Sequence, residues 1–393
     1  MLQKTSGLLD DFSLTAVVAG LLAVVVSFAG SAVIIFQAAS LAGLSQEITS
    51  SWIWAVSIGS AFTGIWLSWR LRTPIITAWS TPGAALLVVM LPQVPFAEAI
   101  TAYRVSALVI IIIGLCGWMD RIIRAIPKGI CAGLFAGILF NFGANVFSSV
   151  ELNPLLAFGM LAVYLLFRKI SPRYCMATVM VCGMALCAAT GIMHLENLEL
   201  ALAKPVFTMP AWSGAAVISL GLPLALINLT GQYISGMAVL RSSGYQTPAG
   251  GILTVTGIAS VLLAPFGSHS INLAAITAAI CTGPEAHENP ARRYVAGIAC
   301  GMFYLIVGLF GATITVLFTA LPPVFIAVLA GLALISAFTT GLIGLVNDTE
   351  NLEAGVITFL TTASGIHFLG LGAAFWGLLL GGAAWFILRK KHS

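Results

Sequence analysis

Residues 264–287 read APFGSHSINLAAITAAICTGPEAH. This stretch places a Pro, a Gly, a His and an Asn inside an otherwise apolar segment. Lipid offers backbone N–H and C=O groups no hydrogen-bond partner, so irregular backbone at membrane depth survives only where it lines a cavity or is buried in protein. We therefore expect this segment to be broken, and to lie where something binds or moves.

The composition around this stretch is that of an all-α polytopic membrane protein. Of the 393 residues, 60% are apolar and 8% are charged, whereas soluble domains carry roughly 25% charged residues. An apolar run needs about 20 residues to cross the bilayer. We predict fourteen transmembrane segments, centred on residues 14–38, 50–69, 74–91, 98–118, 128–147, 154–169, 174–192, 213–240, 249–265, 266–282, 293–318, 323–346, 353–367 and 368–388.

The distribution of basic residues predicts the orientation. With both termini placed in the cytoplasm, all of the 17 Lys and Arg residues except Lys204 and Arg104 fall on the cytoplasmic side, as short cytoplasmic loops require. This bias accounts for the net charge of +4, so we expect no nucleic-acid partner. We expect the lipid bilayer to surround the chain.

The chain divides near residue 200 into two halves with seven predicted spans each, residues 1–200 and 201–393. In each half the third span is short and carries Pro and Gly near its start. The sequence RAIPKGICAGLFAGILF at 124–140 also resembles TALPPVFIAVLAGLALI at 319–335. Because seven is odd, the second copy runs in the opposite direction across the membrane, and we predict two inverted repeats.

The third segment, TPIITAWSTPGAALLVVML at 73–91, begins with strand-like residues and continues as a short helix. Ser80 or Thr81 can cap this helix, and Pro82 suits its first position. A helix from Pro82 to Met90 covers only about half the membrane. Its N-terminus is therefore expected near the midplane.

The tenth segment is expected to mirror this arrangement from the other side. Extended chain after Pro265 and Gly267 would lead to a short helix that Ser268 or Ser270 caps and that runs to Ile280. Two helix N-termini, each partly positive, would then face one point and attract an anion. The alternative is that both segments are merely kinked helices whose freed backbone groups pair with neighbours.

Polar and aromatic residues around this point form the predicted substrate site, where a small planar ligand can hydrogen-bond and stack. The predicted substrate-binding residues are Trp79, Ser80, Thr81, Pro82, Gly83, Asn228, Gln232, Tyr233, Gly267, Ser268, His269, Ser270, Ile271 and Asn272.

His269 is the one ionisable side chain placed in this candidate site, because all 13 acidic residues fall in predicted loops or at span ends. A His titrates near pH ~6.5, and a protonated His269 would favour a carboxylate. We therefore predict that His269 couples transport to a proton. The alternative is a neutral, hydrogen-bonded His that only shapes the site.

The sequence predicts no metal site, no cofactor and no enzyme activity. Glu285, His287 and Glu288 lack further ligands and lie beside Arg292 and Arg293, which favours a charged cytoplasmic loop. No nucleophile, base and orienting acid occur together within the spans.

Three stretches resemble the benzoate transporter family, bacterial benzoate:proton symporters of the inner membrane. These are TAWSTPGAALL at 77–87, SLGLPLALINLTGQYISGMAVLRSSGY at 219–245, and residues 264–287. The resemblance implies a fold similar to the uracil and purine permeases, with a core of spans 1–4 and 8–11, a gate of spans 5–7 and 12–14, and substrate between them. One departure is the eighth span, where the family usually reads Gln-Asn-x-Pro-Gly and this chain has Gln232, Tyr233, Ile234, Ser235 and Gly236.

We therefore predict proton-coupled symport of benzoate or a related aromatic carboxylate across the inner membrane by alternating access. The expected partners are that carboxylate and a proton. The alternatives are a transporter of another small anion or of a nucleobase, or an anion channel. The sequence leaves open whether two copies associate as a homodimer.

Overall fold

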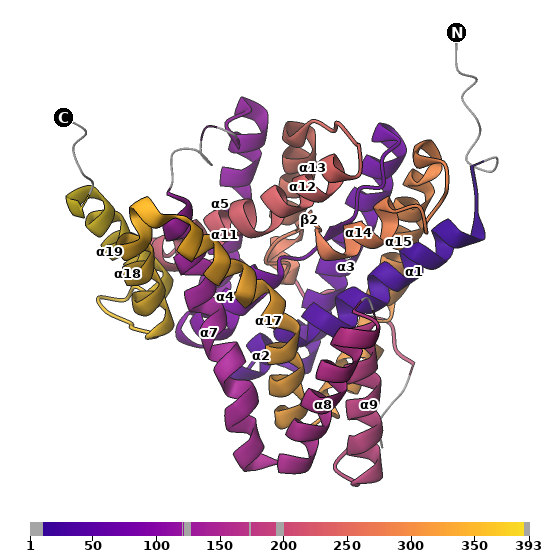
Figure 1. Ribbon diagram of the computed structural model, residues 1–393, viewed down its shortest axis with the longest axis horizontal. Helices are drawn as coiled ribbons and strands as arrows, with labels where there is room; N and C mark the ends of the chain where they lie inside the picture. The colour runs from indigo at the N-terminus through magenta and orange to yellow at the C-terminus, as the bar shows by residue number, and fades with distance from the viewer. Residues whose placement is uncertain (1–10, 120, 122–126, 173, 194–199, 389–393) are drawn as a thin grey trace.

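The computed structural model describes residues 11–119, 121, 127–172, 174–193 and 200–388, and these are almost entirely helical (Figure 1). The first half contains α1 (Leu14–Ser27), the π-helical turn η1 (Phe28–Ala32), α2 (Val33–Leu41), α3 (Gln46–Leu71), β1 (Thr77–Ala78), α4 (Thr81–Met90), α5 (Phe96–Cys116), α7 (Lys128–Leu152), α8 (Pro154–Ile170) and α9 (Cys175–Ala189).

The second half begins with one long helix that two π-helical turns interrupt. It contains α10 (Gly214–Ala216), η3 (Val217–Gly221), α11 (Leu222–Ile227), η4 (Asn228–Tyr233), α12 (Ile234–Ser242), α13 (Ala249–Leu263), the 3₁₀ turn η5 (Ala264–Phe266), β2 (Asn272–Leu273), α14 (Ile276–Thr282), α15 (Tyr294–Leu309), α16 (Gly311–Thr319), α17 (Pro323–Asn347), α18 (Leu352–Ala363) and α19 (Ala373–Leu388).

The helical membrane-protein class is confirmed. Among the described residues, 7 helical runs are long and apolar enough to cross a membrane. They are Leu14–Leu41, Phe96–Cys116, Lys128–Leu152, Gly214–Ser242, Ala249–Phe266, Pro290–Leu309 and Pro323–Asn347. Both termini lie outside the described residues, as do six basic residues of the orientation pattern, namely Lys4, Arg124, Arg173, Arg389, Lys390 and Lys391.

The predicted continuous span at 293–318 is wrong in one detail, because the helix is interrupted at Phe310 between α15 and α16. Phe310 leaves helical geometry with ψ of 22°. Gly311 then packs closely on α3, where a Cβ at this position would lie 3.4 Å from the carbonyl oxygen of Ser50. The turn therefore brings α16 against α3.

Two short strands pair with each other inside the helical bundle. In the view of Figure 1, β2 lies with α3, α14 and α15 on one side and α4, α7 and α17 on the other. β1 and β2 are antiparallel, with Thr77 opposite Leu273 and Ala78 opposite Asn272. The pairing satisfies backbone groups of the third and tenth segments that lipid would leave unpaired.

Serine hydroxyls on the preceding helices accept hydrogen bonds from backbone amides in the extended chain that leads into each strand. Ser68 Oγ on α3 accepts a hydrogen bond of 3.1 Å from the amide of Ile75. Ser260 Oγ on α13 accepts one of 2.8 Å from the amide of Ile271. The two broken segments are thus held in the same way by corresponding neighbours.

The start of α4 agrees with the sequence prediction except at one position. Ser80 is the N-cap, and its Oγ accepts a hydrogen bond of 2.9 Å from the amide of Gly83. The helix begins at Thr81, so Pro82 occupies its second position and not its first. Pro is tolerated there because its missing N–H has no partner within the helix.

The predicted start of the tenth-segment helix is wrong. Neither Ser268 nor Ser270 caps it, because α14 begins at Ile276 and its N-cap is Ala275, which makes no side-chain capping bond. Pairing of β2 with β1 keeps the chain extended past both serines. Ser270 Oγ instead accepts a hydrogen bond of 2.9 Å from Asn272 Nδ2.

The remaining helices pack in two groups. In one group α3 packs against α15, α5 against α13, and α1 against α14 and α15. In the other group α7 packs against α17 and α18, α18 against α19, and α8 against α9.

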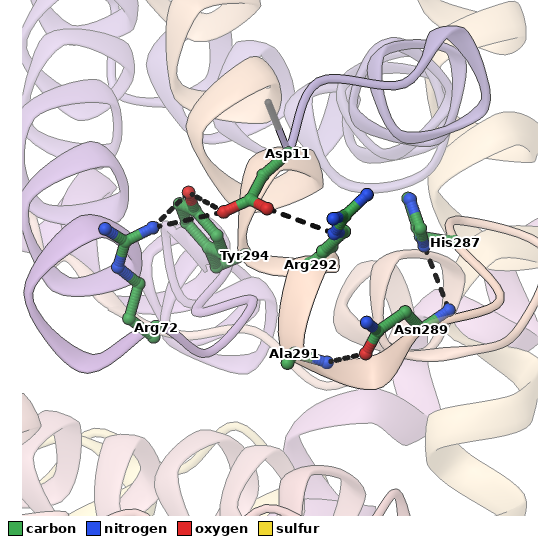
Figure 2. Close-up of polar contacts among 7 residues, drawn as sticks. All are labelled: Asp11, Arg72, His287, Asn289, Ala291, Arg292 and Tyr294. Carbon is green, nitrogen blue, oxygen red and sulfur yellow. Dashed lines mark hydrogen bonds and ion pairs between the residues drawn. The ribbon is translucent and has the colours of Figure 1, made fainter. Parts of the chain in front are cut away.

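Asp11 ties three elements of the first group together at one end of the bundle (Figure 2). Its carboxylate lies 3.4 Å from Arg72 Nη1 and 3.1 Å from Arg292 Nε, and it accepts a hydrogen bond of 2.9 Å from Tyr294 Oη. Arg72 also donates to Tyr294 Oη, and its guanidinium lies 4.5 Å from the Tyr294 ring centroid. The network joins the residues before α1 to the end of α3 and the start of α15.

We expect Asp11→Asn to lower the free energy of unfolding by about 1–2 kcal/mol, less than for a fully buried pair because both arginines are partly exposed. Thermal unfolding of the purified protein in detergent measures this. Glu151→Gln is the matched control, because Glu151 is exposed at the end of α7. Equal midpoints for the Asp11 variant and the native protein would contradict the structural role of this network.

Candidate functional site

His269 bridges α3 and the start of α4. Its Nδ1 lies 3.1 Å from Nε1 of Trp52, and its Nε2 lies 3.1 Å from the carbonyl oxygen of Ser80. An indole N–H can only donate, so Nδ1 must accept and Nε2 must carry the hydrogen that is donated to Ser80. With these two hydrogen bonds the imidazole ring of His269 is neutral. The side chain is buried, with 1% of its surface exposed.

The first turn of α4 lies against the interrupted helix of the second half. A Cβ on Gly231 of η4 would lie 3.2 Å from Cγ of Pro82, and a Cβ on Gly83 would lie 2.8 Å from Cδ1 of Leu224. Both glycines thus allow the close approach of these two elements. The structure brings Ser80, Pro82 and Gly83 of the predicted site next to η4.

Asn228 lies on η4 between these two contacts. It is the first residue of η4, four residues after Leu224 and three before Gly231. Asn228 is buried, and its Oδ1 has no hydrogen-bond partner among the described residues. Buried polar atoms are normally paired, so this oxygen marks a position where a ligand or water can bind.

Two further predicted residues share this property. Trp79 Nε1 and Ser268 Oγ are buried and have no hydrogen-bond partner within the described part of the chain. Trp79 also packs edge-on against Phe28 of η1, with ring centroids 5.1 Å apart. Single π-helical turns such as η1 and η4 occur frequently at functional sites.

Other predicted residues support the site. Tyr233 Oη lies 2.7 Å from Oγ1 of Thr256 and 3.2 Å from the carbonyl oxygen of Ile271, so the Tyr that departs from the family pattern holds the tenth segment. Gly267 has a φ of +101°, and a Cβ there would lie 2.9 Å from Cβ of Trp52. Only glycine fits this position without strain.

Thr81 and Gln232 complete the set of predicted residues, and both lie on the elements that meet here. Thr81 is the first residue of α4 and is half-buried. Gln232 is buried on η4, with 9% of its surface exposed.

A cleft of about 330 Å³ opens beside this region, between η4 and α12 on one side and α7 and α17 on the other. Its volume falls in the range of about 300–1,000 Å³ that is usual for small-molecule sites. The lining residues are Lys128, Cys131, Ala132, Phe135, Leu226, Leu229, Thr230, Gly231, Ile234, Ser235, Thr340 and Gly341.

None of the fourteen predicted site residues lines this cleft, but Gly231 connects the two. A Cβ on Gly231 would meet Pro82 on one side and Cε2 of Phe135, 3.5 Å away, on the other. Sequence reasoning missed Lys128, Phe135 and Thr340. The only signal for the first two was the similarity of 124–140 to 319–335, which identified a repeat and not a site.

A second cavity of about 660 Å³ lies elsewhere, and its lining residues are Gln46, Ile192, Val316, Thr319, Ala320, Leu321, Pro322 and Pro323. It does not involve any predicted site residue.

The loop with the rejected metal ligands is organised by backbone contacts. His287 Nδ1 accepts a hydrogen bond of 2.9 Å from the amide of Asn289 (Figure 2). Arg293 donates to the carbonyl oxygens of His287 and Thr282, both at 2.7 Å. In the described ranges, no group of three or more His, Cys, Asp or Glu side chains is placed to hold a metal ion.

Comparison with known proteins identifies the family. The family described as "Benzoate membrane transport protein" matches residues 10–387. The chain belongs to this family. It is 47% identical over 384 residues to the benzoate membrane transport protein of Acinetobacter baylyi, covering 98% of each chain. It is also 38% identical over 371 residues to inner membrane protein YdcO of Escherichia coli, covering 94% of this chain and 95% of that protein.

Solved structures show the same fold at low sequence identity. The transmembrane domain of the cyanobacterial bicarbonate transporter BicA has a TM-score of 0.56 and 14% identity, and the match covers 96% of this chain and 97% of that one. SLC26A9 has a TM-score of 0.63 and 12% identity, covering 96% of this chain and 65% of that one. As a benzoate transporter family member, the chain is a membrane transporter and not an enzyme.

We expect His269→Leu to lower the free energy of unfolding by about 2–4 kcal/mol, because it leaves the Trp52 N–H buried and unpaired and removes one of the two hydrogen bonds to the Ser80 carbonyl. His269→Gln should cost about half as much, since its amide nitrogen can still donate to Ser80. Thermal unfolding in detergent distinguishes the two variants. Equal midpoints for Leu, Gln and the native His would show that His269 does not connect α3 with α4.

Proposed function

We propose that this chain is a proton-coupled symporter of benzoate or a related aromatic carboxylate, which works by alternating access in the bacterial inner membrane. The observation that carries the proposal is the cleft beside the first turn of α4, in a chain 47% identical to a benzoate membrane transport protein. The cleft has the size and the chemistry for such a substrate.

The lining of the cleft suits both parts of an aromatic acid. Leu226, Leu229 and Ile234 offer apolar surface, and Phe135 offers an aromatic ring against which the substrate ring can pack. Hydroxyl groups of Thr230, Ser235 and Thr340 lie on the same lining. They donate to the helix carbonyls of Leu226, Gly231 and Ser336, and would have to rotate away from these to donate to the carboxylate.

The N-terminus of α4 supplies a further attraction for the carboxylate. Ser80 accepts from the amides of Gly83, at 2.9 Å, and Ala84, at 2.8 Å, and Pro82 has no amide hydrogen. Within the described residues, the Thr81 amide is therefore the one that remains for a ligand in the first turn. The partial positive charge of the helix end adds to this donor. Asn228 would contribute through its amide nitrogen, because its oxygen, like the carboxylate, can only accept.

The proposal includes fourteen membrane segments arranged as two inverted repeats, residues 1–200 and 201–393. Three pairs of features support it. α7 and α17 have 25 residues each and follow Pro127 and Pro322, Ser68 and Ser260 hold corresponding extended segments, and β1 pairs with β2.

The two packing groups support a division into a core of spans 1–4 and 8–11 and a gate of spans 5–7 and 12–14. The cleft lies between core residues on η4 and α12 and gate residues on α7 and α17. Movement of the core against the gate would close this cleft and open the opposite side. In the proposed orientation, with both termini cytoplasmic, this cleft opens toward the cytoplasm.

We propose that His269 couples transport to a proton. The hydrogen bonds of its ring determine what this coupling requires. Nδ1 accepts from Trp52, so it can take up a proton only after the indole N–H has moved away. Protonation would therefore be linked to a shift of α3 relative to the tenth segment. A neutral His269 that only holds Ser80 is the alternative, and the following experiment separates the two.

We expect the native protein in proteoliposomes to accumulate labelled benzoate when an inward proton gradient is imposed. His269→Gln should lose this accumulation, yet still exchange labelled for unlabelled benzoate, because its amide can maintain the bond to Ser80. Gradient-driven accumulation by His269→Gln would assign His269 the structural role. Absence of any benzoate uptake by the native protein would contradict the proposed substrate.

A small inorganic anion is the second candidate, because the solved structures with this fold include a bicarbonate transporter and an anion transporter. The apolar lining and Phe135 favour an aromatic substrate over a hydrated anion. In the same uptake assay, unlabelled 4-methylbenzoate should compete strongly and bicarbonate weakly. Stronger competition by bicarbonate would reverse this assignment.

A further inference from the structure

The mouth of the cleft carries one charged side chain among its described lining residues, Lys128. Lys128 is exposed and is the first residue of α7. The substrate-site residues predicted from the sequence do not include it. Its role therefore has to be argued from the structure, and the argument rests on the proposed function of the cleft.

The position of Lys128 on its own helix is electrostatically unfavourable. The N-terminus of a helix is partly positive, and cations are favoured at the opposite end. A lysine at the first position of α7 thus adds a positive charge where the helix already has one. This arrangement does not stabilise α7, but it concentrates positive potential at the mouth of the cleft.

The neighbouring carboxylate does not neutralise this charge by pairing with it. Asp348 Oδ2 accepts a hydrogen bond of 2.7 Å from the amide of Gly129, and its Oδ1 accepts one of 2.9 Å from Asn351 Nδ2. Both hydrogen bonds hold Asp348 beside the start of α7. In the part of the chain that the structure describes, Lys128 forms no ion pair.

We propose that Lys128 receives the substrate carboxylate at the cytoplasmic mouth of the cleft and sets the apparent affinity for the anion at that face. A charge in a cleft with low-dielectric walls raises the local concentration of the opposite ion. An ammonium acts as a point charge without fixed geometry. Lys128 therefore affects capture and release, and not the arrangement of the substrate deeper in the site.

Membrane vesicles of opposite orientation test this assignment. Inside-out vesicles present the cytoplasmic face to added benzoate, and right-side-out vesicles present the outer face. We expect Lys128→Gln to raise the half-saturating benzoate concentration about five-fold at the cytoplasmic face, as loss of a single rim charge would. Half-saturation at the outer face should change much less than at the cytoplasmic face.

Two variants serve as controls. Lys128→Arg keeps the charge and should behave like the native protein. Lys169→Gln removes an exposed lysine at the end of α8, away from the cleft, and should have no effect. Raising the ionic strength should reduce the difference between the native protein and Lys128→Gln, because salt screens an exposed charge.

Chemical modification provides a test that does not depend on folding of the Gln variant. Lys128→Cys, made in a Cys131→Ser background because Cys131 also lines the cleft, can be treated after purification with aminoethyl or sulfonatoethyl methanethiosulfonate. The positively charged reagent should lower the cytoplasmic half-saturating concentration and the negatively charged reagent should raise it. The Cys131→Ser parent receives the same reagents.

Equal effects of the two reagents, or equal shifts at both faces, would overturn the proposal while native transport remained intact. Saturable benzoate transport by the native protein with no change in Lys128→Gln would also overturn it. If the native protein showed no saturable transport at either face, the proposed function itself would fall, and the role of Lys128 with it.

Discussion

Extended backbone at membrane depth must find its hydrogen-bond partners within the protein, because lipid supplies none. Here the third and tenth segments satisfy this constraint by pairing with each other through β1 and β2. Ser68 and Ser260 satisfy the chain that leads into each strand. These hydroxyl groups lie on α3 and α13, which pack beside the strands. The extended chain that they bind ends where α4 begins.

The same constraint explains why so many polar residues of the predicted site have structural partners. His269 joins Trp52 to Ser80, and Tyr233 holds Ile271. These bonds leave few groups for a substrate. Among the predicted site residues, the buried atoms without a partner in the described structure are therefore the informative ones, namely Asn228 Oδ1, Trp79 Nε1 and Ser268 Oγ.

The sequence predicted some parts of this region more accurately than others. The short helix at α4 was predicted almost to the residue, because its cap and its proline are local signals. The start of α14 was predicted too early, since strand pairing between distant segments overrides local capping preference. The family resemblance implied a substrate position between core and gate, but the residues that line the cleft were not predicted. Phe135 and Thr340 lie far apart in the chain, and only the packing of α7 against α17 brings them together.

The central claim is that the cleft beside the first turn of α4 binds an aromatic carboxylate. A crystal of the protein grown with 4-bromobenzoate tests it directly, because the bromine can be located by its anomalous scattering. The account predicts a peak within the cleft that Phe135, Ile234 and Thr340 line. A peak only in the second cavity, beside Gln46 and Pro322, would contradict the account.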